Sequence, residues 1–277
     1  SVCLSGLPLN DGIDEEADEV LANDLENTLE LAVAWAKEVG EVQRSYFRSG
    51  HLELETKSTV HDVVTKVDKL SESMLIERIG TCFPDHSVLG EESGEHDAHS
   101  DYLWVVDPLD GTNNYSQGLP VFCVSIGLQY RGETLLGVVY APYLDELYTA
   151  IRGKGAFLNN VPIHVSDKTE LDRSVLATGF PYDKGIHPVN NIDNLSRILP
   201  HLRGIRRMGS AAYDLCGVAA GFLDGYWELG LKLWDVCAGV LIVEEAGGHV
   251  EPFRDDRGIA ILSGNPKIVE KMKEYIS

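Results

Sequence analysis

The sequence predicts a mixed protein of helices and strands, of the α+β or α/β class. Three observations support this prediction: apolar residues at helical spacing near the N-terminus, three consecutive strand-like runs in the middle, and strands that alternate with helices in the second half. With 277 residues and 44% hydrophobic content, the chain is long enough for a large core, in one big domain or two smaller ones.

The first half begins with an acidic stretch and continues as two predicted helices. Residues 1–24 contain no Lys or Arg and are rich in Asp and Glu, which predicts a poorly ordered extension. Apolar spacing predicts a helix from Leu25 to about Phe47. Residues 52–56 alternate like a strand, and residues 57–62 form a polar loop. A second helix follows from about Asp68, with these residues expected to point inward: Leu70, Met74, Leu75 and Ile79.

The remaining elements follow from apolar runs and turn residues. Strands are expected at 87–89, 102–106, 121–130, 134–140, 146–151, 174–180, 224–228, 249–253 and 259–262, with a hairpin over 153–165. Helices are expected at 190–199, 209–221, 234–246 and after Asn265-Pro266. We place a domain boundary near residue 160, which divides the chain into an N-terminal domain (25–160) and a C-terminal domain (161–277).

Composition argues against several classes of partner. A formal net charge of −21 disfavours a nucleic-acid or anionic-membrane surface. No apolar run approaches the roughly 20 residues of a membrane span. The five cysteines show no CxxC pair and indicate reduced core residues in a reducing compartment. We therefore expect a cytoplasmic protein. The alternative is an organelle stroma after removal of a targeting peptide, because the chain starts at Ser1 rather than Met.

The stretch Asp107-Pro108-Leu109-Asp110-Gly111-Thr112 is the centre of the predicted site. Pro108 restricts its own φ and biases Asp107 away from helix, and Gly111 allows a backbone conformation that a β-carbon resists. A tight turn should therefore place both acids on its concave side. Two buried acids this close need a counter-charge, for which a divalent cation with oxygen ligands is the simplest. The alternative is a solvated Asp-Pro turn.

Three further acids, Asp68, Glu91 and Asp235, also lie where one element turns into the next, so all five can converge on one cleft. Each has an ordinary alternative: Asp68 and Asp235 as helix caps, and Glu91 as an exposed turn residue. The start of the helix at Gly209-Ser210-Ala211 suits either phosphate or hydroxyl groups, or close helix packing.

These motifs resemble the inositol monophosphatase family. The resemblance rests on Asp107–Thr112, on Gly90-Glu-Glu-Ser93 before it, and on Trp234-Asp235 followed by Gly247-Gly248. It runs from about residue 25 to the C-terminus. It implies a five-layer α-β-α-β-α sandwich, a homodimer, and the lithium-sensitive, Mg²⁺-dependent phosphatase activity of the superfamily that includes fructose-1,6-bisphosphatase.

The resemblance also implies residue roles, with two or three Mg²⁺ ions per site. Glu91, Asp107 and the Leu109 carbonyl would hold one ion, and Asp107, Asp110 and Asp235 a second, while a third would involve Glu91 through water. The catalytic residues would be Glu91, Asp68 and Thr112, of which Asp68 and Thr112 position the attacking water. Phosphate oxygens would bind the Gly111 and Thr112 amides. The alcohol part would contact Glu228, Asp235 and the helix start at Gly209, Ser210 and Ala211, and Lys57 lies in a loop that helps to cover the site.

Two departures from the family pattern concern the substrate more than the reaction. Asn113-Asn114-Tyr115 replaces a common Thr-Asn-Phe, and residues 181–188 have no clear counterpart. We therefore expect hydrolysis of a small phosphate monoester, with myo-inositol 1-phosphate favoured. Histidinol phosphate, a sugar phosphate, fructose 1,6-bisphosphate and a 3′-phosphonucleotide remain alternatives. A glycoside hydrolase, which needs two acids flanking a sugar, and a non-catalytic binding protein are the competing classes.

Overall fold

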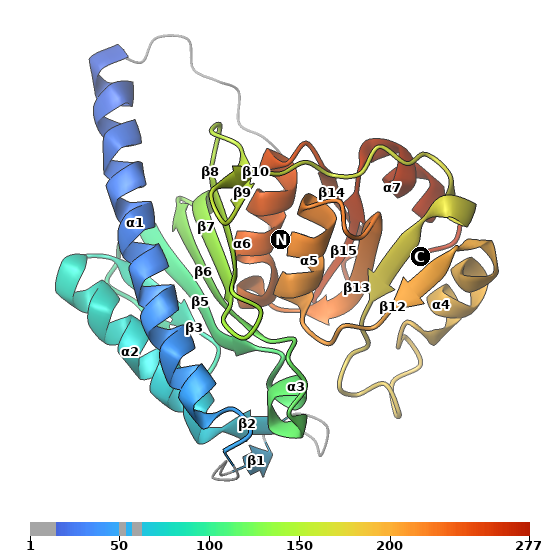
Figure 1. Ribbon diagram of the computed structural model, residues 1–277, viewed down its shortest axis with the longest axis horizontal. Coiled ribbons are helices and arrows are strands. Elements are labelled where there is room, and N and C mark those ends of the chain that lie inside the picture. The colour runs from blue at the N-terminus through green and yellow to red at the C-terminus, as the bar shows by residue number, and fades with distance from the viewer. Residues whose placement is uncertain (1–14, 50–53, 57–62) are drawn as a thin grey trace.

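The computed structural model describes residues 15–49, 54–56 and 63–277, and these fold into five layers (Figure 1). Two outer helices cover an eight-stranded sheet, two central helices separate it from a five-stranded sheet, and two more helices cover the far face (Figure 1). The predicted α-β-α-β-α sandwich is therefore confirmed.

The eight-stranded sheet has the order β10-β9-β8-β7-β6-β5-β3-β4 and contains the predicted meander. Its strands are β3 (Ser87–Gly90), β4 (Gly94–His96), β5 (Tyr102–Asp110), β6 (Cys123–Tyr130), β7 (Glu133–Ala141), β8 (Glu146–Ile151), β9 (Ala156–Leu158) and β10 (Val161–Pro162). All neighbouring pairs are antiparallel except β3 and β5. The short antiparallel ribbon of β1 (Leu54–Thr56) and β2 (Val63–Thr65) lies near α3 (Thr112–Gln117) (Figure 1).

The five-stranded sheet has the order β12-β11-β13-β15-β14. Its strands are β11 (Val175–Thr178), β12 (Gly204–Arg206), β13 (Gly225–Leu231), β14 (His249–Arg254) and β15 (Ile259–Gly264). On its outer face, α4 (Ile192–Ile198) and α7 (Pro266–Met272) bury Ile198 and Met272 against Trp227. Single 3₁₀ turns occur at Leu171–Arg173 and Leu199–His201.

The outer helices α1 (Glu15–Tyr46) and α2 (Lys66–Cys82) pack on the eight-stranded sheet because each has one apolar stripe. On α1 the stripe is Ala32, Trp35, Ala36 and Val39, each at most 4% exposed. Burial of each large apolar side chain contributes about 1.5–3 kcal/mol, so this stripe fixes the layer.

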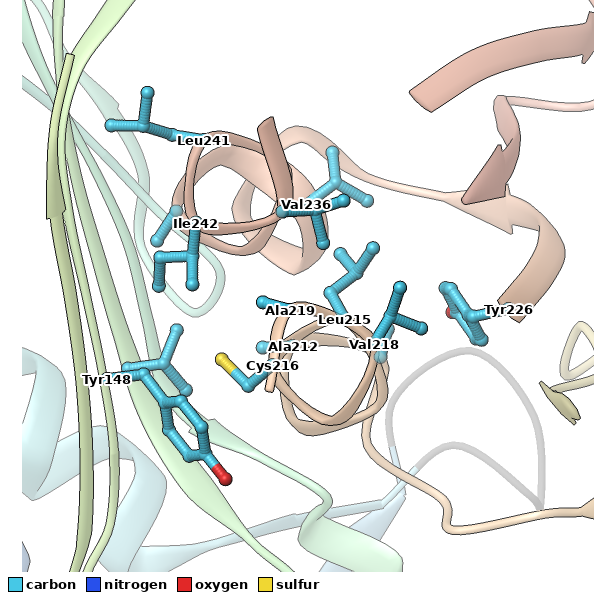
Figure 2. Packing of buried hydrophobic residues seen from close by; sticks show 14 of the residues in the cluster. Tyr148, Ala212, Leu215, Cys216, Val218, Ala219, Tyr226, Val236, Leu241 and Ile242 are labelled. Atoms are coloured by element: carbon cyan, nitrogen blue, oxygen red, sulfur yellow. The ribbon is translucent and has the colours of Figure 1, made fainter. Parts of the chain in front are cut away.

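The central helices α5 (Ala211–Ala219) and α6 (Leu233–Glu245) are buried between the two sheets, so they are apolar on more than one side (Figure 2). Figure 2 shows Leu215 and Val218 of α5 between the Tyr148 and Tyr226 side chains of the flanking sheets. Gly137 on β7 permits the close approach of α6, because a Cβ there would lie 2.9 Å from the Ala238 carbonyl oxygen.

Several predictions need correction. Helix α1 begins at Glu15 rather than Leu25, so residues 15–24 of the predicted acidic extension are helical, in agreement with their content of the helix formers Glu, Ala and Leu. Leu70 was expected to point inward but is 37% exposed. Strands β2, β4 and β12, of three residues each, were missed. Lys57 and residues 1–14 lie outside the described residues.

Two sequence expectations concern cysteines and membranes. Cys123, Cys216 and Cys237 are buried free thiols, whereas the free Cys82 is exposed. Among the described residues, no helix combines the length and apolar character that crossing a bilayer requires.

Candidate active site

The strand predicted to end at residue 106 continues to Asp110, so the two acids lie in the last part of β5 rather than in a turn, and the chain turns at Gly111. Pairing with β6 shifts register between Asp107 and Asp110, so the strand bulges where the two acids lie. Gly111 then adopts φ +96°, in the left-handed region, and begins α3. A Cβ at Gly111 would also lie 2.9 Å from the Val121 carbonyl oxygen, so both the conformation and the space require glycine.

Three carboxylates converge at this turn. One oxygen each from Asp107, Asp110 and Asp235 lies within 4.8 Å of the other two, close enough to share a metal ion. Asp107 is 1% exposed. In the part of the chain that the structure describes, no basic side chain forms an ion pair with any of the three. A divalent cation would supply the missing positive charge and prefers these hard oxygen ligands, so the residues fit such an ion.

Burial and mutual repulsion favour the protonated forms of these acids in the absence of a cation. Burial, followed by the charges of Glu91, Asp110 and Asp235, raises the pKa of Asp107 well above its usual range. Burial and the charge of Asp110 do the same to the pKa of Asp235. The pKa of Asp110 rises only to about 6, because burial is opposed by hydrogen bonds from Ser210 and Ala212.

The central helices position two members of the cluster. The Ser210 hydroxyl, at the N-cap of α5, and the Ala212 amide each donate to Asp110 Oδ2 at 2.7 Å. Asp235 lies in the first turn of α6, where its Oδ2 accepts from the Lys232 amide at 2.7 Å. The N-cap residue of α6 is therefore Lys232, and the alternative that Asp235 is the N-cap is wrong. Asp235 lies three residues inside the helix and accepts the amide hydrogen of the N-cap residue.

Asp68 and Thr112 form a hydrogen-bonded pair beside the cluster. The Thr112 hydroxyl lies 2.6 Å from Asp68 Oδ1 and 3.0 Å from the Leu109 carbonyl oxygen. Asp68 Oδ2 accepts from the Thr65 amide at 2.8 Å, which also closes a capping box on α2. Burial raises the pKa of Asp68 despite these hydrogen bonds.

Glu91 reaches the site from a turn that another acid holds in place. Glu72 of α2 is 2% exposed, and its carboxylate accepts from the Glu92 amide at 2.8 Å and the Ser93 amide at 2.7 Å. The charge of Glu91 raises the pKa of Asp107, so it lies close to the cluster. Glu91 also lines the same cavity as the three aspartates.

That cavity has a volume of about 310 Å³ and extends from the aspartate cluster to β13. Its far wall includes Glu228, Asp214 and Arg207, of which only Glu228 was expected. Tyr226 donates its hydroxyl to Glu228 Oε2 at 2.6 Å. Burial raises the pKa of Glu228 to about 7.

The segment after β11 completes the wall with Phe180, Pro181 and Tyr182. It is anchored by Asp183, whose two carboxylate oxygens accept from the Arg257 guanidinium at 2.7 and 3.0 Å. A two-point pair of this kind fixes orientation as well as position. Residues 181–188, which have no clear counterpart in the family pattern, thus contribute Pro181 and Tyr182 to the cavity wall.

The structure brings together every described residue that the resemblance implied. Those lining the cavity are Glu91, Asp107, Leu109, Asp110, Gly111, Thr112, Gly209, Ser210, Ala211, Glu228 and Asp235, and Asp68 joins them through Thr112. Sequence reasoning missed Arg207, Asp214 and Glu72. The available signal for Asp214 was an acid within the small and apolar residues of the helix predicted over 209–221.

Comparisons with known proteins agree with this geometry. The model of the inositol monophosphatase family matches residues 24–274. The chain is 43% identical over 254 residues to the Nus factor SuhB of Pasteurella multocida, which covers 90% of this chain and 95% of that protein. It is 41% identical over 230 residues to an inositol-1-monophosphatase of Synechocystis sp., which covers 81% and 80%.

Two solved structures are similar over nearly the whole chain. The inositol monophosphatase of Anabaena (Nostoc) sp. PCC 7120 is 41% identical with a TM-score of 0.80, covering 91% of this chain and 96% of that one. The extragenic suppressor protein SuhB of Bartonella henselae is 36% identical with a TM-score of 0.83, covering 90% and 98%.

Proposed function

The chain belongs to the inositol monophosphatase family, and from that premise we propose that it is a Mg²⁺-dependent phosphomonoesterase acting on a small polyol phosphate. The favoured substrate is myo-inositol 1-phosphate. The observation that carries the proposal is the convergence of Asp107, Asp110 and Asp235 beside a polar cavity. A phosphate anion is repelled by such carboxylates unless cations lie between them.

The ligand set follows the chemistry of the donors. Asp107, Asp110 and Asp235 would hold one Mg²⁺, and Glu91, Asp107 and the Leu109 carbonyl a second, with a third near Glu91 through water. Mg²⁺ prefers hard oxygen donors of this kind. When bound, these ions supply charge neutralisation for the phosphate and activation of water for attack.

The proton of the attacking water has a defined route in this proposal. In this proposal the Thr112 hydroxyl donates its hydrogen to Asp68, 2.6 Å away, rather than to the Leu109 carbonyl oxygen at 3.0 Å, and its lone pairs can accept a hydrogen bond from water. As the water attacks, its proton passes to the Thr112 oxygen and the Thr112 proton passes to Asp68. The raised pKa of Asp68 favours this transfer. Neither a Cys nor a Ser nucleophile is needed, so attack is direct.

The phosphate and the alcohol part occupy opposite ends of the cavity. The Gly111 and Thr112 amides would hold phosphate oxygens, and Gly209, Ser210, Ala211, Asp235 and Glu228 would contact the alcohol. Ser210 also holds Asp110, so it would couple the two ends. By resemblance to this family, we propose that the protein works as a homodimer.

One experiment tests the proposal. Phosphate release is measured at fixed Mg²⁺ from myo-inositol 1-phosphate, histidinol phosphate, a sugar phosphate, fructose 1,6-bisphosphate and a 3′-phosphonucleotide. We expect turnover that EDTA abolishes and added Mg²⁺ restores, with inhibition by Li⁺ at concentrations on the order of tens of millimolar. Release of reducing sugar from glycosides without phosphate release would instead identify a glycoside hydrolase.

The relatives named Nus factor SuhB raise a second candidate, a binding factor that retains the fold. The net charge of −21 disfavours direct binding to nucleic acid, so the partner in that case would be a protein. No turnover of any monophosphate in the panel, with Mg²⁺ bound, would favour this candidate over the phosphatase.

A further inference from the structure

Asp214 is a buried acid with no partner in the described part of the chain. It lies in the first turn of α5 and on the cavity wall, and it is 1% exposed. Its Oδ1 is enclosed and makes no hydrogen bond, and its carboxyl forms no ion pair with Arg207 on the same wall. A buried carboxyl without donors destabilises a fold, so its presence here needs an explanation.

Asp224 is a second buried acid of this protein, and it has the partners that Asp214 lacks. Asp224 is 2% exposed and also has an unpartnered Oδ1. Its Oδ2, however, accepts from Lys168 Nζ at 2.9 Å and from the Val175 amide at 2.7 Å, which compensates its charge. Asp214 has neither contact, and the favourable effect of the α5 dipole is small compared with the cost of burial.

The surroundings of Asp214 favour hydroxyl groups as ligands. Burial and the charge of Glu228 raise the pKa of Asp214 well above its usual range. A protonated carboxyl can donate one hydrogen bond and accept others, as a hydroxyl group requires. Tyr226 is committed to Glu228 and does not take this role.

We propose that Asp214 is a hydroxyl-binding residue that, together with Glu228, recognises two neighbouring hydroxyl groups on the alcohol part of the substrate. The inference rests on the proposed phosphatase function and deepens it by assigning to Asp214 a contact with the hydroxyl groups of the polyol. An alcohol without ring or chain hydroxyls leaves Asp214 unsatisfied and is therefore disfavoured.

The test replaces Asp214 by the similarly shaped Leu, which cannot form hydrogen bonds. KM for myo-inositol 1-phosphate should rise by about tenfold, the effect expected for one lost hydrogen bond. KM for cyclohexyl phosphate, which has the same ring without hydroxyls, should stay unchanged. Tm should stay the same or rise, because an unsatisfied buried acid is removed. Asp214→Asn, which keeps donors and an acceptor, should stay close to the parent in KM.

Asp224→Asn is the matched control, because it changes a buried acid away from the cavity. It should lower Tm and leave both KM values unchanged. The proposal is overturned if Asp214→Leu keeps the parental ratio of the two KM values, or if histidinol phosphate binds more tightly than myo-inositol 1-phosphate.

Binding of free myo-inositol, followed by saturation-transfer NMR on the parent and both Asp214 variants, gives a readout without turnover. Weaker binding of myo-inositol to Asp214→Leu than to the parent supports the inference, whether or not any monophosphate is hydrolysed. If no monophosphate is hydrolysed, the proposed phosphatase function is overturned, but the inference about Asp214 is not. Equal binding to the parent and the Leu variant overturns the inference. If the Leu variant does not fold, Asp214→Ala takes its place: weaker binding to Asp214→Ala than to Asp224→Asn supports the inference, and equal binding overturns it.

Discussion

Asp235 combines a structural contact with a proposed metal-binding role, and one substitution separates the two. Asn can accept the hydrogen bond from the Lys232 amide as Asp does, but it has no negative charge. Asp235→Asn should therefore fold with unchanged or higher metal-free stability and lose activity by about a hundredfold or more. Its Mg²⁺ requirement should also rise. Parental turnover with an unchanged Mg²⁺ titration would leave Asp235 with the helix contact alone.

Gly179 controls the position of Glu228. A Cβ at Gly179 would lie 2.2 Å from both carboxylate oxygens of Glu228, so Gly179→Ala must displace that side chain. KM for a polyol phosphate should rise, by several-fold to about a hundredfold, while Tm changes little because the end of the Glu228 side chain can move. Steady-state kinetics on Gly185→Ala provides the control, because a Cβ there meets nothing within 4 Å. Equal KM values in the two variants would contradict this view of the wall.

At the scale of elements, α2 supports the site through Glu72. Its carboxylate is the acceptor for two amides of the turn that follows Glu91. Glu72→Ala should release this turn, lower activity and raise the half-saturating Mg²⁺ concentration, by about 10- to 100-fold, as is typical for residues that orient metal ligands. A Mg²⁺ titration of phosphate release measures both effects.

Glu77→Ala on the same helix serves as the control, because Glu77 is exposed. Glu72→Gln, which keeps one acceptor oxygen, should fall between the parent and Glu72→Ala. If Glu72→Ala and Glu77→Ala behave alike, the turn holds its position without Glu72.

The elements were predictable where the signal was local. The turn at Gly111 follows from the conformational freedom of glycine, and α1 follows from the spacing of its apolar residues, whereas the strand continues through Asp107 and Asp110 before that turn. The inward side of α2 was predicted incorrectly at Leu70, because the buried face of that helix contains Asp68, Ser71 and Glu72. The spacing of apolar residues cannot identify a buried helix face whose residues are polar because they support a functional site.

The site was predictable to the extent that motif residues lie at the ends of elements. Arg207 and Asp214 were not predicted, because their place on the cavity wall depends on how α5 packs between the two sheets. That packing joins segments far apart in sequence, as in the hydrogen bond from Ser210 to Asp110. No local pattern contains such information, and only the similarity to a family can supply part of it.

At the scale of the whole molecule, the raised pKa values determine how stability depends on pH. The pKa of Asp110 rises from an ordinary 3.8 to about 6, and that of Glu228 from 4.5 to about 7. An acid with a higher pKa in the folded chain binds its proton more tightly there, so its contribution to stability is greatest below the unfolded pKa. Metal-free protein should therefore lose stability as pH rises from about 4 to 7.

Scanning calorimetry in EDTA measures this slope, and a second series in Mg²⁺ should show a smaller decline, because bound cations favour the charged carboxylates. Asp110→Asn removes one of the titrating groups and should flatten the metal-free profile. A metal-free Tm that increases across this range would contradict the raised pKa values of these acids in the cation-free state.

The central helical layer also has a consequence for the order of folding. The aspartate cluster takes Asp107 and Asp110 from β5 of one sheet and Asp235 from a helix packed between both sheets. Long-range contacts of this kind form slowly, after local helices and hairpins. During refolding, circular dichroism should therefore recover before phosphate release, and the interval between them measures how long the two sheets take to close on the helices between them.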